Sequence, residues 1–427
     1  MNDSFAGIPG STGSALWSAQ AHMPSVLGNQ IEIARGEGAY VWTTEGQRLL
    51  DATAGLWHAN IGHGRPELAQ AAYEQMLRLE TYHVFGRFLN DRAVELADRI
   101  AAYAPFNDAK VIFGSGGSDA VDSACKLARR HWQLQGKPEK TMVLSRTFAY
   151  HGLHAYGTSI AGLQFNRDGF GTDSLVPETE RVDHSDLASV IASVDRIGAH
   201  RIAAIVAEPI MGTGGVIPPA PGYLEGVQKL CAENDILFIA DEVITGFGRA
   251  GTMFASERFG IVPDMLLMAK GITSGYAPLG GILVAPRIWQ QFYAGLDAPI
   301  LRHGLTYAGH ATAAAVAMAN LDVLENDGLV ARAAELEAVL DGALDRLRGR
   351  ERVVDVRIAG FLGGVQLDER IDGDRLSQFA LDRGVILRIL RGNTVQISPP
   401  FVVTDDEVAS VVAVIDEAIA DQDGIGA

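Results

Sequence analysis

The stretch at residues 264–281, "DMLLMAKGITSGYAPLGG", places a lysine directly after a run of apolar residues, with glycine and small polar residues following at once. Lys270 stands out because the chain has only six lysines among its 35 basic residues. A short apolar run bounded by such residues is typical of a buried strand. Lys270 is therefore a candidate functional residue, although a strand-end lysine can also extend its ammonium group to solvent or pair with an acid.

Similar apolar runs recur through the middle of the chain and alternate with amphipathic stretches. The run "KVIFG" ends in glycine, and the runs "AAIVA", "ILFIA" and "MLLMA" are followed at once by an acid or a lysine. Helical patterns follow the first two runs at 119–134 and 221–234. This alternation predicts an α/β fold whose central sheet is mainly parallel and flanked by helices. In such sheets ligands bind beyond the carboxyl ends of the strands, which is where Lys270 and the acids fall.

The two ends of the chain differ from its middle. Residues 1–60 include hairpin-like material, and residues 310–427 contain long helical stretches rich in alanine and leucine, followed by short strands. We expect residues 61–309 to form the large domain, and both chain ends to form a smaller α+β domain, with 1–60 joining 310–427.

Composition excludes several classes of protein. The chain has 427 residues, 48% of them hydrophobic, and a net charge of -17, which disfavours binding to nucleic acid and to anionic membranes. No apolar run approaches the roughly 18 residues of a membrane helix, and the N-terminus lacks the basic start and apolar core of a signal peptide. The two cysteines, Cys125 and Cys231, lack metal-ligand spacing. We expect a cytoplasmic protein with buried thiols and no metal site.

Two further features lie at predicted strand ends. The loop "FGSGGSDAVDSACKLARR" opens a helix, with Ser118 expected as its N-cap and Asp119 in its first turn, and its free amide groups suit a phosphate. The same pattern also fits a tight turn, because it matches neither the P-loop nor the GxGxxG fingerprint. Asp241 ends "ILFIA" and is either a strand-end cap or a partner for a cationic group.

Together these residues match the needs of one cofactor. Pyridoxal phosphate requires an anion site, a flat face for its ring, a carboxylate near its pyridine nitrogen and an amine for a Schiff base. The glycine loop, Tyr150 in "YHG", Asp241 and Lys270 supply all four within one α/β unit.

Four stretches extend this match to a family. "IVAEPIMGTGGVIPPAPGYL", "LFIADEVITGFGR", "MLLMAKGITSGYAPLGG" and "HGLTYAGHATAAA", in this order and spacing, resemble the class III pyridoxal-phosphate aminotransferases of fold type I. The resemblance runs from about residue 31 to residue 403, and "DEVITGFGR" with the downstream lysine is its most specific part.

The resemblance implies a role for each matching residue. Lys270 would form the Schiff base and carry the catalytic proton, Asp241 would hold the pyridinium, and Val243 and Tyr150 would face the two sides of the ring. Thr306 would reach the phosphate in the partner subunit, which makes a homodimer the smallest competent unit. The implied cofactor-binding set is Gly116, Gly117, Ser118, Tyr150, His151, Asp241, Val243, Lys270 and Thr306. The phosphate loop departs from the family's Asn-Ser-Gly-Ser/Thr-Glu-Ala, reading Ser-Gly-Gly-Ser-Asp-Ala, and the family's His-Pro reads His-Ala at 310–311.

The substrate site resembles one branch of that family. "GLWHANIGHG" and "TYHVFGRF" are similar to amine:pyruvate and β-alanine:pyruvate aminotransferases, and imply that Trp57, Phe85 and Tyr150 wall an apolar pocket. Trp57 and Phe85 also fit an ordinary core. Thr213 replaces the glutamate that pairs with an arginine in relatives acting on ornithine or 4-aminobutyrate. Arg388 aligns best as the arginine that binds a substrate carboxylate, with Arg391 as a rival, and either also fits a solvated surface.

The function implied is transfer of an amino group from a small amine or omega-amino acid to a 2-oxo acid, most simply pyruvate, by a ping-pong mechanism. A diaminopelargonate-type aminotransferase and an aminomutase of the same fold remain alternatives, since the catalytic residues overlap. A nicotinamide oxidoreductase is disfavoured because GxGxxG is absent, and a cofactor-binding protein without turnover because Lys270 and Asp241 are both present.

Overall fold

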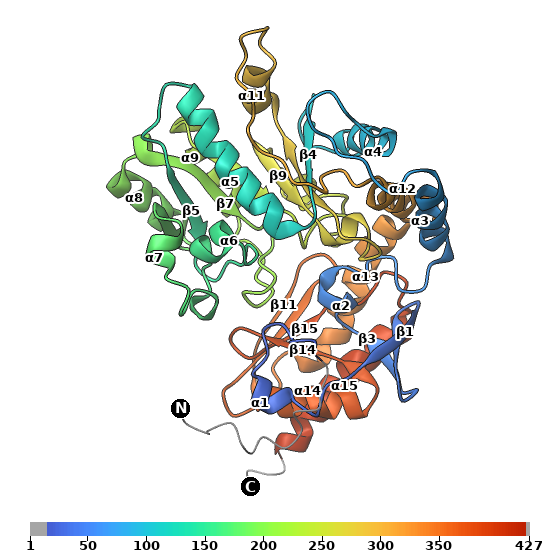
Figure 1. Cartoon of the computed structure of the whole chain (residues 1–427). Coiled ribbons are helices and arrows are strands. Elements are labelled where there is room, and N and C mark those ends of the chain that lie inside the picture. Colours follow the sequence, from blue (N-terminus) through green and yellow to red (C-terminus); the bar gives the residue numbers. More distant parts are fainter. Residues whose placement is uncertain (1–14, 424–427) are drawn as a thin grey trace, which may run out of the picture.

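A computed structural model describes residues 15–423 of the chain. Figure 1 shows a large α/β region, coloured from cyan to yellow, above a second region in which the blue start and the red end of the chain lie together. The predicted α/β class is confirmed by this arrangement.

The large region is built on a seven-stranded sheet of mainly parallel strands. Its order is β4 (Lys110–Gly114), β10 (Gly280–Val284), β9 (Met265–Met268), β8 (Leu237–Asp241), β7 (Ile202–Ala207), β5 (Met142–Arg146) and β6 (Thr179–Val182). Only β10 runs antiparallel to its neighbours, so the carboxyl ends of the other six strands lie at one edge of the sheet. β7, β8 and β9 are buried throughout, which explains their unbroken apolar runs.

Helices cover both faces of this sheet because successive strand residues point to opposite sides. Ala204 and Val206 of β7 pack in a cluster with α5 (Gly117–Leu134), whereas Ile202 and Ile205 pack with α8 (Leu187–Ile197) and α9 (Tyr223–Glu233). The amphipathic stretches predicted at 119–134 and 221–234 are thus α5 and α9.

The second region joins the two ends of the chain. β1 (Ile33–Glu37), β2 (Tyr40–Thr43) and β3 (Arg48–Asp51) form one sheet with β13 (Val385–Ile386), whose Val385 pairs in parallel with Leu50. An antiparallel sheet has the order β11 (Val353–Ile358), β12 (Gly363–Leu367), β15 (Thr394–Ile397) and β14 (Arg388–Leu390). The predicted boundaries at residues 60 and 309 stay predictions, and residues 1–14 lie outside the described part.

Helices from both parts of the sequence complete the fold. α12 (Ala311–Asn326) packs against α3 (Pro66–Arg78) and α4 (Asp91–Ala101), and α15 (Asp405–Asp423) packs against α13 (Leu329–Leu344) and α14 (Gly373–Asp382). The shorter helices are α1 (Met23–Val26), α2 (Ala54–Trp57), α6 (Ala155–Ile160), α7 (Thr172–Leu175), α10 (Ala255–Arg258) and α11 (Pro286–Trp289). Among residues 15–423, no helix combines the length and apolar character needed to cross a bilayer.

A buried arginine joins the two regions. The guanidinium of Arg249 donates hydrogen bonds to the carbonyl oxygens of Phe361 (3.2 Å) and Pro399 (2.8 Å) and to the side-chain oxygen of Asn60 (3.0 Å). It also lies 4.6 Å from the ring centre of Phe401. Burial lowers the pKa of Arg249 to about 9, because its charge is removed from water. Segments from the start, middle and end of the chain therefore meet at one side chain.

Candidate active site

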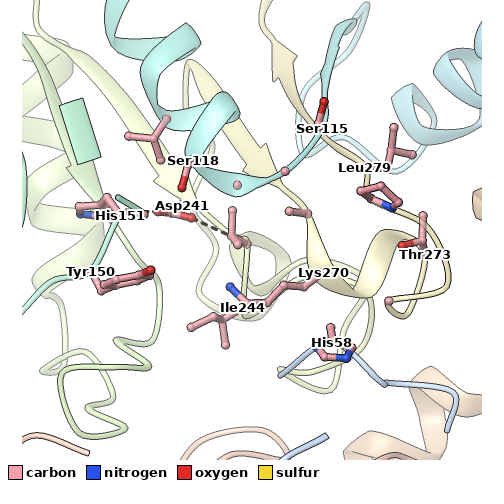
Figure 2. Close-up of a pocket in the computed structure, with 18 of the residues that line it drawn as sticks. His58, Ser115, Ser118, Tyr150, His151, Asp241, Ile244, Lys270, Thr273 and Leu279 are labelled. Atoms are coloured by element: carbon pink, nitrogen blue, oxygen red, sulfur yellow. Dashed lines mark hydrogen bonds and ion pairs between the residues drawn. The ribbon is translucent and has the colours of Figure 1, made fainter. Parts of the chain in front are cut away.

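A cavity of about 440 Å³ lies at the carboxyl ends of the parallel strands. It is lined by Ser115 to Ser118 after β4, Tyr150 to Gly152 after β5, Glu208 after β7, Asp241 and Val243 at β8, and Lys270 after β9. Figure 2 shows Ser118, Tyr150, His151, Asp241 and Lys270 converging from separate elements, with His58 on the N-terminal segment. Besides Asp241 and Lys270, the structure brings together six residues of the predicted cofactor set: Gly116, Gly117, Ser118, Tyr150, His151 and Val243. Ser115, from the same loop, lines the cavity although it was not predicted.

The glycine loop presents the amino end of α5 to this cavity. The helix begins at Gly117 with Gly116 as its N-cap, so the expectation that Ser118 is the N-cap was wrong. The carboxylate of Asp119 instead folds back and accepts the backbone N–H of Ser115 (2.7 Å). A Cβ on Gly117 would lie 2.9 Å from a methyl carbon of Val243, so a glycine is needed where the loop crosses that side chain. First-turn amides and the helix dipole suit a phosphate group here.

Asp241 and His151 form a buried pair at the base of the cavity. One carboxylate oxygen of Asp241 lies 2.7 Å from Nδ1 of His151, and the other accepts the backbone N–H of Val243 at 3.1 Å. Nε2 of His151 is buried and has no hydrogen-bond partner in the described residues. These contacts orient the Asp241 carboxylate and leave it capacity to accept a further hydrogen bond from a ring N–H.

Glu208 is a cavity residue that the sequence reasoning missed. Its carboxylate is buried and accepts the backbone N–H of Tyr150 (3.1 Å) and that of Gly212 (3.0 Å). Burial raises the pKa of Glu208. The buried Arg146 donates to the backbone carbonyl of Glu208, and burial lowers its pKa. Glu208 thus fixes the backbone that carries Tyr150, and an acid following the apolar run "AAIVA" was the available signal.

Lys270 follows β9 and begins a 3₁₀ turn that ends at Ile272. Its backbone φ is 48°, a left-handed value uncommon for a lysine, and its side chain extends into the cavity toward the side where Tyr150 and Asp241 lie (Figure 2). Burial lowers the pKa of Lys270 to about 8, and the charges of Asp241 and Glu208 oppose part of that fall. A sizeable fraction of the amine is therefore neutral near pH 8 and can act as a nucleophile or base.

Trp57 and Arg388 lie together beside Tyr150. The Arg388 guanidinium is 4.8 Å from the ring centre of Trp57, which is buried, and its Nη1 is buried without a hydrogen-bond partner in the described residues. Burial lowers the pKa of Arg388 and raises the pKa of Tyr150. The charge interaction between the two groups partly offsets both shifts, which indicates that the two side chains lie close together. Arg391 instead stacks on Phe148, 3.3 Å from its ring centre.

Four predicted site residues do not line the cavity of their own chain: Trp57 and Arg388, described above, and Phe85 and Thr306. Phe85 is 45% exposed and contacts the backbone region of Gly304, and Thr306 is exposed. Their assigned roles at the cofactor and substrate stay predictions.

His58 is a second residue that the sequence reasoning missed. Its ring is wedged between Gly55 and Gly275, where an added Cβ would lie 2.3 Å from a ring carbon in each case. Nδ1 accepts the backbone N–H of Leu56 (3.2 Å), which leaves Nε2 to carry the proton of the neutral ring. Burial lowers the pKa of His58. Other missed lining residues are Val121, Ile244, Ala269, Thr273, Ala277, Pro278 and Leu279.

This cavity can hold a flat, phosphorylated carbonyl compound next to a primary amine. The family model Aminotransferase class-III matches residues 23–419. The chain is 34% identical over 418 residues to an omega-aminotransferase from Caulobacter vibrioides, covering 92% of this chain and 94% of that protein. It is 35% identical over 409 residues to a putrescine–pyruvate aminotransferase from Pseudomonas aeruginosa, covering 89% and 88%.

A solved structure matches over nearly the whole length. The crystal structure of an amine transaminase from an uncultivated Pseudomonas species, in its PLP-bound form, has a TM-score of 0.90 and 34% identity, covering 96% of this chain and 99% of that chain. The fold is that of a pyridoxal-phosphate transaminase. The chain belongs to the class III aminotransferases, a family that depends on pyridoxal phosphate.

The residues present fit that cofactor. The glycine loop offers backbone donors at a helix terminus, Asp241 offers an oriented carboxylate, and Lys270 offers an amine whose pKa burial lowers. The crossing of Gly117 over Val243 leaves no room for a larger side chain beside the cavity.

Proposed function

We propose that this transaminase moves an amino group from a small primary amine or omega-amino acid to a 2-oxo acid, with pyruvate as the simplest acceptor, in two half-reactions. The main support for a 2-oxo acid acceptor is the Arg388 guanidinium, which stacks on Trp57 beside Tyr150. Its buried Nη1 has no hydrogen-bond partner in the described chain. A planar, delocalised cation placed this way suits a carboxylate that has two oxygens.

Each residue of the cavity has a separate role in this proposal. Pyridoxal phosphate supplies an aldehyde for the amine and a ring that accepts the electrons released when the substrate C–H bond breaks. Gly116, Gly117 and Ser118 would bind the phosphate through the amino end of α5, and Asp241 would keep the ring nitrogen protonated. Lys270 would hold the aldehyde, and its neutral amine would take the proton from the substrate carbon and return it.

Three further contacts support this division. Tyr150 and Val243 would face the two sides of the ring, and His151 keeps the Asp241 carboxylate in place through their 2.7 Å contact. Glu208 holds the Tyr150 backbone, so the stacking face is fixed before any ligand enters.

The amine pocket is formed in part by aromatic surface. Tyr150 lines the cavity and is partly buried, so its ring offers apolar area that requires no charge on the donor's side chain. Trp57, at 3% exposure, belongs to a core cluster and packs against the Arg388 guanidinium. Thr213 stands where relatives with an arginine–glutamate switch carry the acid. Arg388 therefore has no acid at that position to pair with when the acceptor is absent, and its partner is the carboxylate of the acceptor itself.

A second copy of the chain completes the site in this proposal. Thr306 and Phe85 are exposed, and Tyr82, Phe88 and Leu89 form an exposed apolar surface next to Phe85. We place this surface at a homodimer interface, so that Thr306 reaches the cofactor phosphate of the partner. The free buried thiols of Cys125 and Cys231 support a reducing, cytoplasmic location.

An absorbance titration of the purified enzyme tests the proposal. The visible band of the bound cofactor should bleach when 1-phenylethylamine or β-alanine is added and should return when pyruvate follows. A band that bleaches but returns only with 2-oxoglutarate would contradict the pyruvate assignment, and a band that responds to neither donor would contradict the donor class.

A further inference from the structure

A second cavity, of about 340 Å³, lies beside the carboxyl-terminal half of α5 and shares no lining residue with the catalytic cavity. Its polar wall consists of Lys126, Arg130, Arg302, His303 and Ser123. Its remaining wall is apolar, formed by Ile112, Leu127, Ile300 and Leu301. No carboxylate from residues 15–423 lines it, although acidic residues outnumber basic ones by 52 to 35 in the whole chain.

The hydrogen bonds of this basic pocket keep its charge unneutralised. Nζ of Lys126 lies 3.1 Å from Nδ1 of His303, and Nε2 of His303 lies 2.6 Å from the hydroxyl of Ser123. An ammonium group can only donate, so Nδ1 accepts, Nε2 carries the proton, and the imidazole is neutral. Burial and the charge of Lys126 both lower the pKa of His303, which agrees with this assignment. Lys126 thus keeps two further N–H donors.

The cations of the pocket differ from most others in the protein. Arginine side chains elsewhere, such as Arg99, Arg258 and Arg348, form ion pairs with acids. Within residues 15–423, none of Lys126, Arg130 and Arg302 forms an ion pair with a carboxylate, and the side chain of Arg130 donates only to Gln133. Like charges gathered in one hollow repel each other, and an anion in the hollow removes that cost.

We propose that this pocket binds a small phosphate-type oxyanion, either inorganic phosphate or the phosphate group of a monoester. The guanidinium groups of Arg130 and Arg302 can each give two parallel hydrogen bonds to such an oxyanion, and the Lys126 ammonium adds a compact charge. The apolar wall lowers the local dielectric and strengthens these contacts. A bound anion would connect α5, whose first turn lines the catalytic cavity, to the segment at 300–303 that precedes Thr306.

Isothermal titration of the holoenzyme with inorganic phosphate, at an ionic strength held constant with chloride, tests this site. We expect saturable binding without a change in the cofactor's visible absorbance, because the cofactor phosphate site is already filled. In the double variant Lys126→Gln/Arg130→Gln the affinity should fall at least about tenfold, since two charge-assisted contacts are lost. Glycerol phosphate, titrated in the same way, distinguishes the sources: tighter binding than inorganic phosphate assigns the site to a monoester.

The matched control removes two charges elsewhere. Lys229 and Arg35 are exposed and form surface ion pairs with Glu233 and Glu37, so Lys229→Gln/Arg35→Gln should bind phosphate as the unmodified enzyme does. Because the double pocket variant alters the helix α5, the single exposed substitution Arg302→Gln provides a second measurement, with an expected loss of several-fold. Equal phosphate affinity in the unmodified enzyme and in both pocket variants, or no saturable binding, would overturn the proposal.

Discussion

Substitution of Arg388 by glutamine should separate the acceptor from the rest of the reaction. A carboxylate bound by the guanidinium gains two charge-assisted hydrogen bonds, each contributing about 1.5–3 kcal/mol, whereas glutamine retains one neutral bond of about 1 kcal/mol. The net loss is about 3 kcal/mol, which corresponds to a fall of about a hundredfold in kcat/KM for pyruvate. The fold should tolerate the change, because Nη1 of Arg388 makes no hydrogen bond within residues 15–423.

The measurement is the half-reaction in which the aminated enzyme meets pyruvate or an aldehyde without a carboxylate, such as butanal. Arg388→Gln should slow the reaction with pyruvate about a hundredfold and leave that with butanal within about threefold. Arg391→Gln is the matched control, because Arg391 stacks on Phe148 and should leave both rates unchanged. The reasoning is refuted if the loss follows Arg391, or if Arg388→Gln slows both acceptors equally, which would reduce Arg388 to a packing partner of Trp57.

The remaining predictions concern the amine, the joint between regions and the thiols. Because burial lowers the pKa of Lys270 to about 8, the neutral amine is about tenfold more abundant at pH 9 than at pH 7. The rate at which the apoenzyme incorporates pyridoxal phosphate should therefore rise about tenfold over this range and then level off. A rate that continues to rise about tenfold per pH unit would indicate a lysine with an ordinary pKa. Arg249→Met removes three buried hydrogen bonds and should lower the free energy of unfolding in urea by about 3 kcal/mol, against about 0.5 kcal/mol for the exposed Arg35→Met. Cys125 and Cys231 are buried with raised pKa values and should react with a thiol reagent only after denaturation; fast labelling of the native enzyme would contradict their burial.

The strand-end residues could be predicted from the sequence because their signal is local. Asp241 and Lys270 each follow an unbroken apolar run, and a parallel sheet brings the carboxyl ends of its strands to one edge whatever the loops do. The resemblance to a family then assigned roles to Tyr150, His151 and Val243, which the structure places at the same cavity.

The missed residues depend on contacts between distant segments. Glu208 follows an apolar run, as Asp241 and Lys270 do. Its role depends on hydrogen bonds that it accepts from the backbone N–H groups of Tyr150 and Gly212, and the spacing of residues in the sequence does not reveal these contacts. His58 reaches the cavity because Gly275, far along the chain, leaves space for its ring. The N-cap at Ser118 was misplaced because glycine gives a weak capping signal, whereas serine gives a strong one.

The pairing of β3 with β13 limits the order in which the chain can fold during its synthesis. β1 to β3 emerge early, yet the free edge of β3 finds its partner only after Val385 has been translated. The seven strands of the large sheet, which end at Val284, are complete long before that point and can fold first. Strands β1 to β3 therefore have an unpaired edge at β3 during most of synthesis. This edge can pair with β13 only after Ile386 has been translated.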